Sequence, residues 1–170
     1  MNTQVKSRER VAVHGEVFTA EREVKAMCDL VDNECKDYKT TFLEPACGNG
    51  NFLAEILSRK LASIAQAPDY ERKSLIALSS LYGIDILKDN TTECRKRLYA
   101  IWDTHSEHSP SAQIQAARIL KFNIVCGDTL NPDTITLREW IFPEDSIIPD
   151  SKTFKLSEEV SGQYEFSFEA

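Results

Sequence analysis

The sequence predicts an α/β fold in which a partial parallel sheet is flanked by helices. Three short apolar stretches, at residues 41–46, 81–86 and 123–130, have the composition of buried strands, and each contains one acidic residue. Segments with helical periodicity separate them, and strands that alternate with helices are typical of a parallel sheet. A chain of 170 residues suits one core, so we expect a single domain over residues 1–170.

The composition narrows the function classes. A net charge of −7 argues against a protein that holds nucleic acid through a basic face of its own. Neither the cysteines nor His105 and His108 have partners at metal-ligand spacing, so no metal site is expected. No apolar run is long enough for a membrane span, and the polar N-terminus is no signal peptide. We therefore predict a cytoplasmic protein without a membrane partner, in which five widely spaced thiols stay reduced: Cys28, Cys35, Cys47, Cys94 and Cys126.

The N-terminal segment is predicted to be a flexible stretch followed by one helix. Residues 1–10 are polar and are expected to be flexible. A helix is expected from about Ala20 to Val31, with Thr19 as its N-cap and Glu21 in the first turn, where an acid suits the helix dipole. Its apolar face is formed by residues at helical spacing: Val24, Met27, Cys28 and Val31.

Residues 41–53, with the sequence T-F-L-E-P-A-C-G-N-G-N-F-L, organise the rest of the chain. They indicate a strand that breaks at Pro45, turns through Gly48 and Gly50, and opens a helix at about Asn51. The glycines allow unusual backbone angles and let a ligand approach the main chain. The free N–H groups at the start of the helix favour anionic or acceptor-rich ligand groups.

The helix after this turn is predicted to run to about Gln66. Its inward face is expected to contain Phe52, Leu53, Ile56, Leu57 and Leu61. A tight strand-to-helix turn would by itself explain the two glycines. A dinucleotide-binding fingerprint would place a third glycine or an alanine where Leu53 stands, so the pattern argues against NAD.

Three further helices are predicted before the last of these strands. They cover residues 70–81, residues 90–102 and a stretch opened by Ser109-Pro110, whose hydroxyl and proline are typical of a helix start. Apolar residues at helical spacing, including Trp102, indicate the sides that face the core.

The second and third strands each lead to an aspartate. Asp85 lies near the end of the strand at residues 81–86, and Gly127-Asp128 follows the strand that begins at Asn123. Ligands bind at the carboxyl ends of parallel strands, where an acid can accept hydrogen bonds from both ribose hydroxyls. Taken singly, Asp85 could also cap a helix and Asp128 could mark a simple turn.

Four segments together resemble a known family. They are E-P-A-C-G-N-G-N-F at residues 44–52, G-I-D-I at 83–86, N-I-V-C-G-D-T-L at 123–130 and H-G-E-V-F-T-A at 14–20. These strings resemble the motifs of S-adenosylmethionine-dependent DNA methyltransferases of the adenine-N6 type, which act in restriction-modification systems. The resemblance implies a Rossmann-like methyltransferase fold, with S-adenosylmethionine as the cofactor.

The resemblance also implies roles for individual residues. Phe18 and Thr19 would lie over the methionine end of the cofactor, although Ala20 replaces the proline that is usual after them. Asp85 would bind the ribose, Ile86 would pack against the adenine, and Asp128 would accept a hydrogen bond from the adenine amino group. Glu44, an acceptable variant of the usual aspartate, belongs to the first motif. The cofactor-binding residues are then Phe18, Thr19, Glu44, Ala46, Gly48, Gly50, Asp85, Ile86 and Asp128.

The match runs out after residue 130. An active enzyme of this type needs an N/D-P-P-Y/F motif, whose polar groups align the target amino group and whose aromatic ring stacks on the flipped base. The chain contains no such tetrapeptide, because Asn131-Pro132-Asp133 lacks the second proline and the aromatic residue. Residues 131–162 are expected to be a loop-rich insertion, and the alternation over 163–168 predicts a strand. No catalytic residue can be named, so the enzymatic status stays open.

Three interpretations follow from this partial match. The chain is the cofactor-binding half of an N6-adenine DNA methyltransferase, and DNA is its substrate only together with a further subunit or domain. Alternatively, it is an inactive cofactor-binding or regulatory interaction module in a restriction or phage-defence system, or a methyltransferase with unusual catalytic residues. The sheet would leave an open edge beside residues 41–46, so a homodimer contact, a partner subunit or the strand at 163–168 is expected to cover it.

Overall fold

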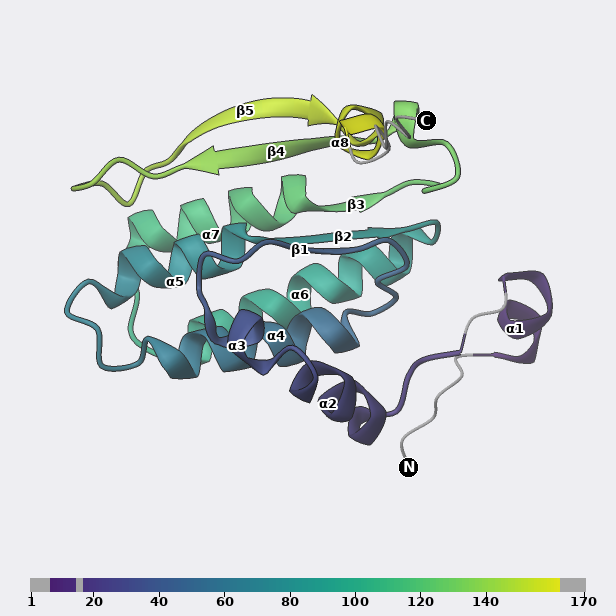
Figure 1. Cartoon of the computed structure of the whole chain (residues 1–170), viewed down its shortest axis with the longest axis horizontal. Coiled ribbons are helices and arrows are strands. Elements are labelled where there is room, and N and C mark those ends of the chain that lie inside the picture. The colour runs from purple at the N-terminus through teal and green to yellow at the C-terminus, as the bar shows by residue number, and fades with distance from the viewer. Residues whose placement is uncertain (1–6, 15–16, 163–170) are drawn as a thin grey trace, which may run out of the picture.

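The computed structural model describes residues 7–14 and 17–162 and has a mixed α/β architecture (Figure 1). Its central element is a parallel sheet of β1 (Phe42–Glu44), β2 (Leu81–Asp85) and β3 (Ile124–Cys126), in the order β1-β2-β3. This confirms the predicted α/β class and the partial parallel sheet flanked by helices. Residues 15–16 of the N-terminal motif and the strand expected at 163–168 lie outside the described residues.

The register of the strands brings their carboxyl ends to one edge of the sheet. Glu44 pairs with Gly83, and Asp85 pairs with Cys126, so the turns that follow the three strands are neighbours. Among the described residues, β1 pairs only with β2, and its other edge carries no strand. The expected open edge beside residues 41–46 is therefore present in the described part of the chain.

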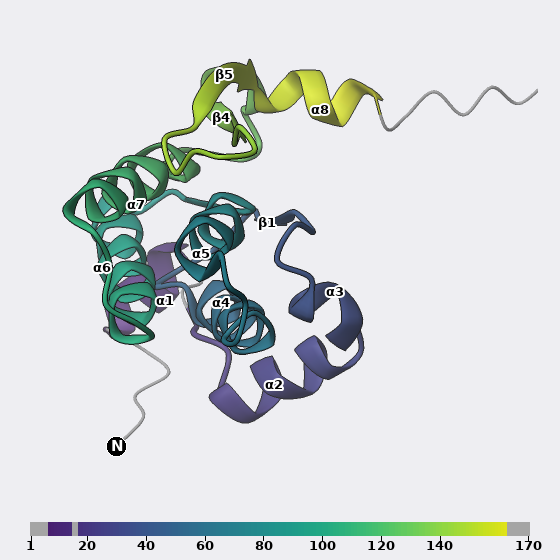
Figure 2. The same ribbon diagram turned by 90° about the vertical axis from the view of Figure 1, so that its left-hand side faces the viewer.

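Four long helices connect and cover the strands. They are α4 (Asn51–Ser63), α5 (Tyr70–Ser79), α6 (Lys88–Thr104) and α7 (Pro110–Asn123). Figure 1 shows α4 and α6 on one side of the sheet and α7 leading directly into β3, and Figure 2 shows α6 and α7 side by side. Ser109 caps α7 as expected, because its Oγ accepts a hydrogen bond from the Ala112 amide at 3.2 Å. Trp102 is fully buried, and its indole Nε1 donates to Ser74 Oγ at 2.9 Å. None of the described helices is both long enough and apolar enough to cross a lipid bilayer.

The N-terminal segment differs from the expectation. A helix, α1 (Arg8–His14), begins within the stretch expected to be flexible. The next helix, α2 (Glu21–Asp29), has Ala20 at its N-cap and no side-chain cap, so the prediction of Thr19 as the cap is wrong. A separate short helix, α3 (Asp32–Lys36), follows it.

The predicted apolar face of this helix is only half correct. Val24 and Cys28 are buried, but Met27 is 54% exposed and Val31 is 43% exposed. The described chain bends after Asp29, so the helical spacing no longer holds at Val31.

Residues 131–162 are not a loop-rich insertion. They form a 3-10 turn, η1 (Pro132–Thr134), an antiparallel pair of strands, β4 (Thr136–Ile141) and β5 (Asp150–Lys155), and a helix, α8 (Leu156–Gly162). The prolines that suggested loops stand outside the strands, where a missing N–H costs nothing. The pair lies on the side of the sheet opposite α4 and α6 (Figure 1), and Trp140 Nε1 fastens it to Asn123 Oδ1 at 2.7 Å.

A buried lysine holds the chain just before β1. Lys60, on α4, is fully buried, and its Nζ donates to the carbonyl oxygens of Asp37 at 2.7 Å and Thr40 at 2.6 Å. Its ammonium also lies 5.1 Å from the centre of the Phe42 ring. Burial lowers the pKa of Lys60 to about 8, because the charged form loses its water.

We expect this lysine to make stability rise with pH in a defined window. The unfolded chain keeps a lysine pKa of about 10.4, so between about pH 8 and pH 10.4 the unfolded state binds more protons, and the free energy of unfolding increases with pH. Between about pH 7 and pH 10, the free energy of unfolding of the unaltered chain should rise by about 2 kcal/mol more than that of a Lys60→Met variant. Urea titrations of both proteins at several pH values measure it, and parallel pH curves for the two would contradict it.

Candidate functional site

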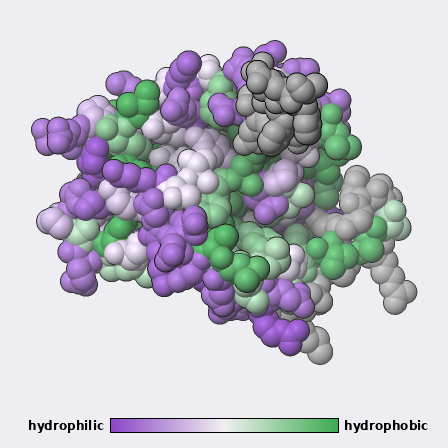
Figure 3. Space-filling view, viewed as in Figure 1, coloured by the Kyte–Doolittle hydropathy of each residue, from purple (hydrophilic) through white to green (hydrophobic). Residues whose placement is uncertain are grey.

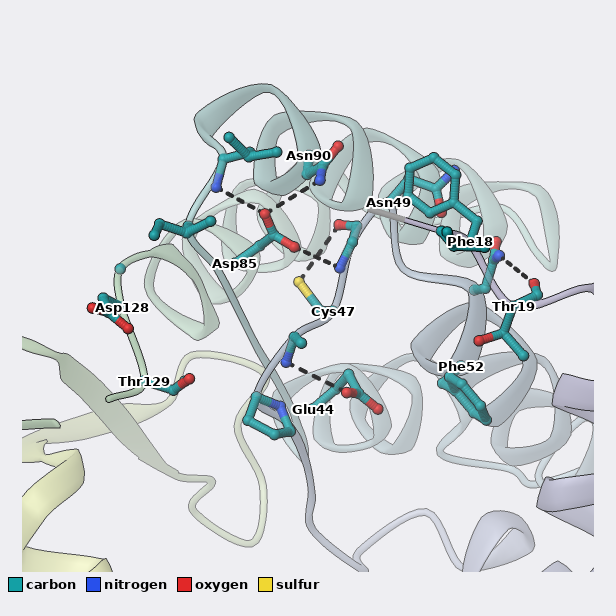
Figure 4. A pocket seen from close by; sticks show the side chains of 18 of the residues that line it. Phe18, Thr19, Glu44, Cys47, Asn49, Phe52, Asp85, Asn90, Asp128 and Thr129 are labelled. Carbon is teal, nitrogen blue, oxygen red and sulfur yellow. Dashed lines mark hydrogen bonds between the residues drawn. The ribbon is translucent and has the colours of Figure 1, made fainter. Parts of the chain in front are cut away.

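A cavity of about 430 Å³ lies at the carboxyl ends of the three parallel strands (Figure 4). Four separate segments line it: residues 17–19, the turn and first residues of α4 after β1, residues 85–90 after β2, and residues 127–130 after β3. Parallel strands in sequential order place these turns together, which is the usual position of a ligand site in an α/β sheet.

Eight of the nine residues predicted to bind a cofactor line this cavity. They are Phe18, Thr19, Glu44, Ala46, Gly48, Asp85, Ile86 and Asp128. They come from positions that span more than 100 residues of sequence, so the fold brings together residues that the sequence assigned to one site. The ninth residue, Gly50, has a different surrounding.

Gly50 does not line the cavity and instead lies against a neighbouring helix. Its φ is +86°, in the left-handed region that favours glycine, and it stands just before α4. A Cβ at this position would lie 2.6 Å from Cys94 Sγ on α6, which is closer than real contacts allow. The turn and the neighbouring helix therefore both require glycine at this position, and the predicted cofactor-binding role of Gly50 stays a prediction.

Gly48 combines both requirements at the cavity. Its φ is +52°, and an added Cβ would lie 3.0 Å from Cε1 of the Phe18 ring, which lies beside the turn in Figure 4. The Gly48 amide donates to Asp85 Oδ2 at 2.9 Å. The glycine therefore allows the aromatic ring and the aspartate to approach the same stretch of backbone.

The Phe18-Thr19 segment lines two neighbouring cavities. Thr19 is held by its carbonyl oxygen, which accepts a hydrogen bond from Asn51 Nδ2 at 2.9 Å, and Asn51 Oδ1 accepts one from Arg97 at 2.5 Å. A second hollow of about 490 Å³, between α2, α4 and α6, lies on the other side of this segment and shares Phe18, Thr19, Asn49 and Asn51 with the first. The segment is thus fixed to the start of α4.

Asp85 is the most extensively bonded side chain of the site. Its Oδ2 accepts a hydrogen bond from the Gly48 amide, and its Oδ1 accepts bonds from the Leu87 amide at 2.8 Å and from Asn90 Nδ2 at 3.2 Å (Figure 4). A carboxylate offers about four acceptor positions, two on each oxygen. Among the described residues three positions are therefore occupied, and the fourth, on Oδ2, is open.

The two other acids of the cavity differ in their environment. Glu44 is half-buried, and this burial raises the pKa of its carboxyl group, although the Ala46 amide, which donates to Oε1 at 3.4 Å, acts in the opposite direction. Asp128 accepts a hydrogen bond from the Leu130 amide at 3.0 Å and one from Asn131 Nδ2 at 2.7 Å. Asp128 thus holds its own turn, as the simpler interpretation expected, and each of its oxygens keeps a further acceptor position.

Several residues of the cavity were missed by the sequence analysis. Asn49 stands between the two glycines and lines the cavity, and its Oδ1 is buried without a hydrogen-bond partner among the described residues. Asn90 was missed because it lies in the first turn of α6, five residues after Asp85. Two exposed apolar side chains at the cavity, Val17 and Leu130, were also missed, because only the fold brings them together.

The chemistry of the cavity favours binding over covalent catalysis. Cys47 is buried beside Cys94, and this neighbour together with burial raises the pKa of the Cys47 thiol, so it stays protonated and unreactive. Of the described residues, none of those lining the cavity is a lysine, arginine or histidine. No group of three or more histidine, cysteine or acidic side chains in the described ranges has a metal-binding arrangement.

Comparison with known proteins adds no relative. No family model matches the chain, and neither a curated protein nor a solved structure shows significant similarity to it. The geometry of the cavity and the sequence motifs are therefore the basis for assigning a function.

Proposed function

We propose that the cavity binds S-adenosylmethionine and that the chain is the cofactor-binding part of an N6-adenine DNA methyltransferase of the restriction-modification type. The observation that carries the proposal is the charge of the cavity. Three carboxylates, Glu44, Asp85 and Asp128, line it, and no cationic side chain of the described residues does. Such a lining attracts a cation and repels phosphates.

This charge distinguishes between nucleoside cofactors. NAD carries a pyrophosphate, which would meet three acids and no arginine or lysine in the described lining. S-adenosylmethionine carries a sulfonium and no phosphate, and its adenosine offers ribose hydroxyls and an amino group as hydrogen-bond donors. Asp85 Oδ2, which accepts one hydrogen bond from the Gly48 amide, has a second acceptor position suited to such a donor.

The residues of this chain would hold the cofactor by position. Asp85 would accept a ribose hydroxyl through Oδ2, the exposed Ile86 would cover the adenine, and Asp128 would accept from its amino group. The sulfonium supplies an electrophilic methyl group, so no metal is needed. Under this proposal the three-stranded sheet is part of a Rossmann-like methyltransferase fold, in a cytoplasmic protein whose cysteines stay reduced.

Methyl transfer would need groups that this sequence lacks. The chain has no N/D-P-P-Y/F tetrapeptide. The edge of β1 is unpaired among the described strands, Leu43 beside it is 45% exposed, and Figure 3 shows apolar surface between polar side chains on this face. We propose that a partner subunit or a second copy covers this edge and that DNA is bound only in that assembly. If the chain sediments as a monomer and binds no dye that reports exposed apolar surface, the proposed cover of the β1 edge is wrong.

Calorimetric titration of the purified chain tests the cofactor. We expect S-adenosylmethionine and S-adenosylhomocysteine to bind with micromolar dissociation constants, on the order of 8 kcal/mol of binding free energy. NAD should not bind under the same conditions, which makes it the control for the charge argument. A folded chain that binds neither sulfur nucleoside would refute the proposal.

The second candidate is a cofactor-binding or regulatory interaction module without catalysis, which the missing tetrapeptide favours. Both candidates predict cofactor binding, so the distinguishing assay is transfer of labelled methyl groups to DNA. A polypeptide from a neighbouring reading frame that carries N-P-P-Y should restore transfer if the chain is half of an enzyme. The module predicts no transfer with any such addition.

A further inference from the structure

The N-terminal helix α1 reaches the candidate site through one arginine. Arg10 donates from Nη1 to Asp89 Oδ2 at 2.5 Å, and from Nη2 to Asp89 Oδ1 at 3.3 Å and Asn90 Oδ1 at 3.1 Å. Asp89 and Asn90 belong to the first turn of α6, about 80 positions further along the chain, and Figure 1 shows α1 standing apart from the other helices. The contact therefore fixes α1 beside the residues that follow β2.

The second end of Asn90 contacts the central acid of the cavity. Its Nδ2 donates to Asp85 Oδ1 at 3.2 Å, while its Oδ1 accepts from Arg10. A guanidinium only donates and a carboxylate only accepts, so both bonds form in just one orientation of the amide. Because Asn90 is 1% exposed, water cannot easily replace either partner. Arg10 thereby determines which way the Asn90 amide points.

The orientation of Asn90 determines which acceptor of Asp85 is available. Asn90 and the Leu87 amide occupy both acceptor positions on Oδ1. Within the described part of the chain, Oδ2 accepts from the Gly48 amide alone, so its second position is open to a ligand in the cavity. The carboxylate as it is held can accept one hydroxyl, not the two expected from the sequence, because the second oxygen is already in use.

We infer that Arg10 is a positioning residue for ligand binding, which acts through Asn90 to hold Asp85 ready for one ribose hydroxyl. The inference rests on the proposed function for the nature of the ligand. Arg10 itself does not line the cavity, and its pairing with Asp89 anchors the guanidinium at the start of α6. It follows that α1 contributes to specificity for a ribose, although it lies outside the site.

The chain of hydrogen bonds from Arg10 through Asn90 to Asp85, here called the relay, can be tested first in the protein without ligand. In nitrogen–proton correlation spectra, Arg10→Met should shift the Asn90 side-chain amide and the backbone amides of Gly48 and Leu87, which report on the two oxygens of Asp85. Asp89→Asn is the matched control, because it weakens the anchor and leaves the Arg10–Asn90 bond. We expect smaller shifts at Gly48 in this variant. An unmoved Gly48 amide in Arg10→Met, or equal shifts in both variants, would overturn the relay.

The consequence for specificity is tested by titrating S-adenosylhomocysteine and its 2′-deoxy and 3′-deoxy analogues. Arg10→Met should weaken S-adenosylhomocysteine about 3- to 10-fold, the worth of one hydrogen bond. For the analogue that lacks the hydroxyl bound by Asp85, the same substitution should lower the affinity by less than about 2-fold. Arg10→Lys should bind S-adenosylhomocysteine more tightly than Arg10→Met does, because lysine can still donate a hydrogen bond to Asn90. Equal losses for all three ligands would overturn the specificity role. If the unaltered chain binds none of them, the proposed function is wrong, and the spectra still decide whether the relay exists.

Discussion

Replacing Gly50 by alanine is expected to lower the free energy of unfolding by about 3 kcal/mol. Two independent costs add at this position. A side chain at φ +86° costs about 1–2 kcal/mol in the left-handed region, and crowding of a filled core costs about 1–3 kcal/mol. The crowding arises because the new Cβ would lie 2.6 Å from the fully buried Cys94 Sγ. Denaturant titration measures the change.

A double-mutant cycle separates the two costs. After Cys94→Ala, the nearest remaining atom is the Cys94 Cβ at 3.4 Å, which is an ordinary contact. In that background Gly50→Ala should cost only about 1–2 kcal/mol, the share of the backbone angle. An equal cost in both backgrounds would show that the thiol is not the obstacle. In that case α4 and α6 would have to shift apart when Gly50 is replaced.

Replacing Asp85 by asparagine is expected to lower the affinity for S-adenosylhomocysteine about 10- to 100-fold, because a hydrogen bond to a charged group contributes about 1.5–3 kcal/mol. The new amide has one acceptor oxygen in place of two. That oxygen is best placed towards the two donors, Leu87 and Asn90, so an NH2 group then faces Gly48 and the ligand. Calorimetric titration measures the loss.

Two controls accompany this variant. Asp133→Asn makes the same change of charge at an exposed residue that does not line the cavity, and its affinity should stay within about 2-fold of the unaltered chain. Asp85→Ala leaves three donors without their acceptor and should reduce stability as well as binding. Unchanged affinity in a folded Asp85→Asn protein would mean that Asp85 holds the turn after β2 and does not bind the ligand.

The strands, the long helices and the location of the cavity could be predicted because local patterns determine them. The apolar run that ends at Asp85 predicts a buried strand by its composition, and Ser109-Pro110 starts a helix by its own chemistry. The alternation of strands and helices then places the ends of the strands together. The resemblance of the motifs, and not this pattern, named the individual residues, and eight of those nine line the cavity.

The parts that could not be predicted depend on contacts between distant segments. The spacing around Gly50 does not indicate that a neighbouring helix approaches it, because only the fold brings Cys94 to that position. In the sequence, Pro143 and Pro149 favour loops in the region of the β4–β5 pair. The bond from Trp140 to Asn123 that holds the pair joins segments that only the fold brings together. Arg10 gave no signal, since its partners are about 80 residues away.

The parallel pairing of the sheet has a consequence for how fast the chain folds. Each pairing joins segments about 40 residues apart, as Phe42 with Leu81 and Gly83 with Ile124, and such long loops must close before any pairing energy is gained. The rate of folding should therefore be slow for a chain of this size, and a nascent chain cannot form the cavity until β3 has left the ribosome. The chain therefore becomes able to bind the ligand only when all three strands are present. Chains truncated before residue 130 should not bind it even weakly, and they should be bound by chaperones or degraded by proteases.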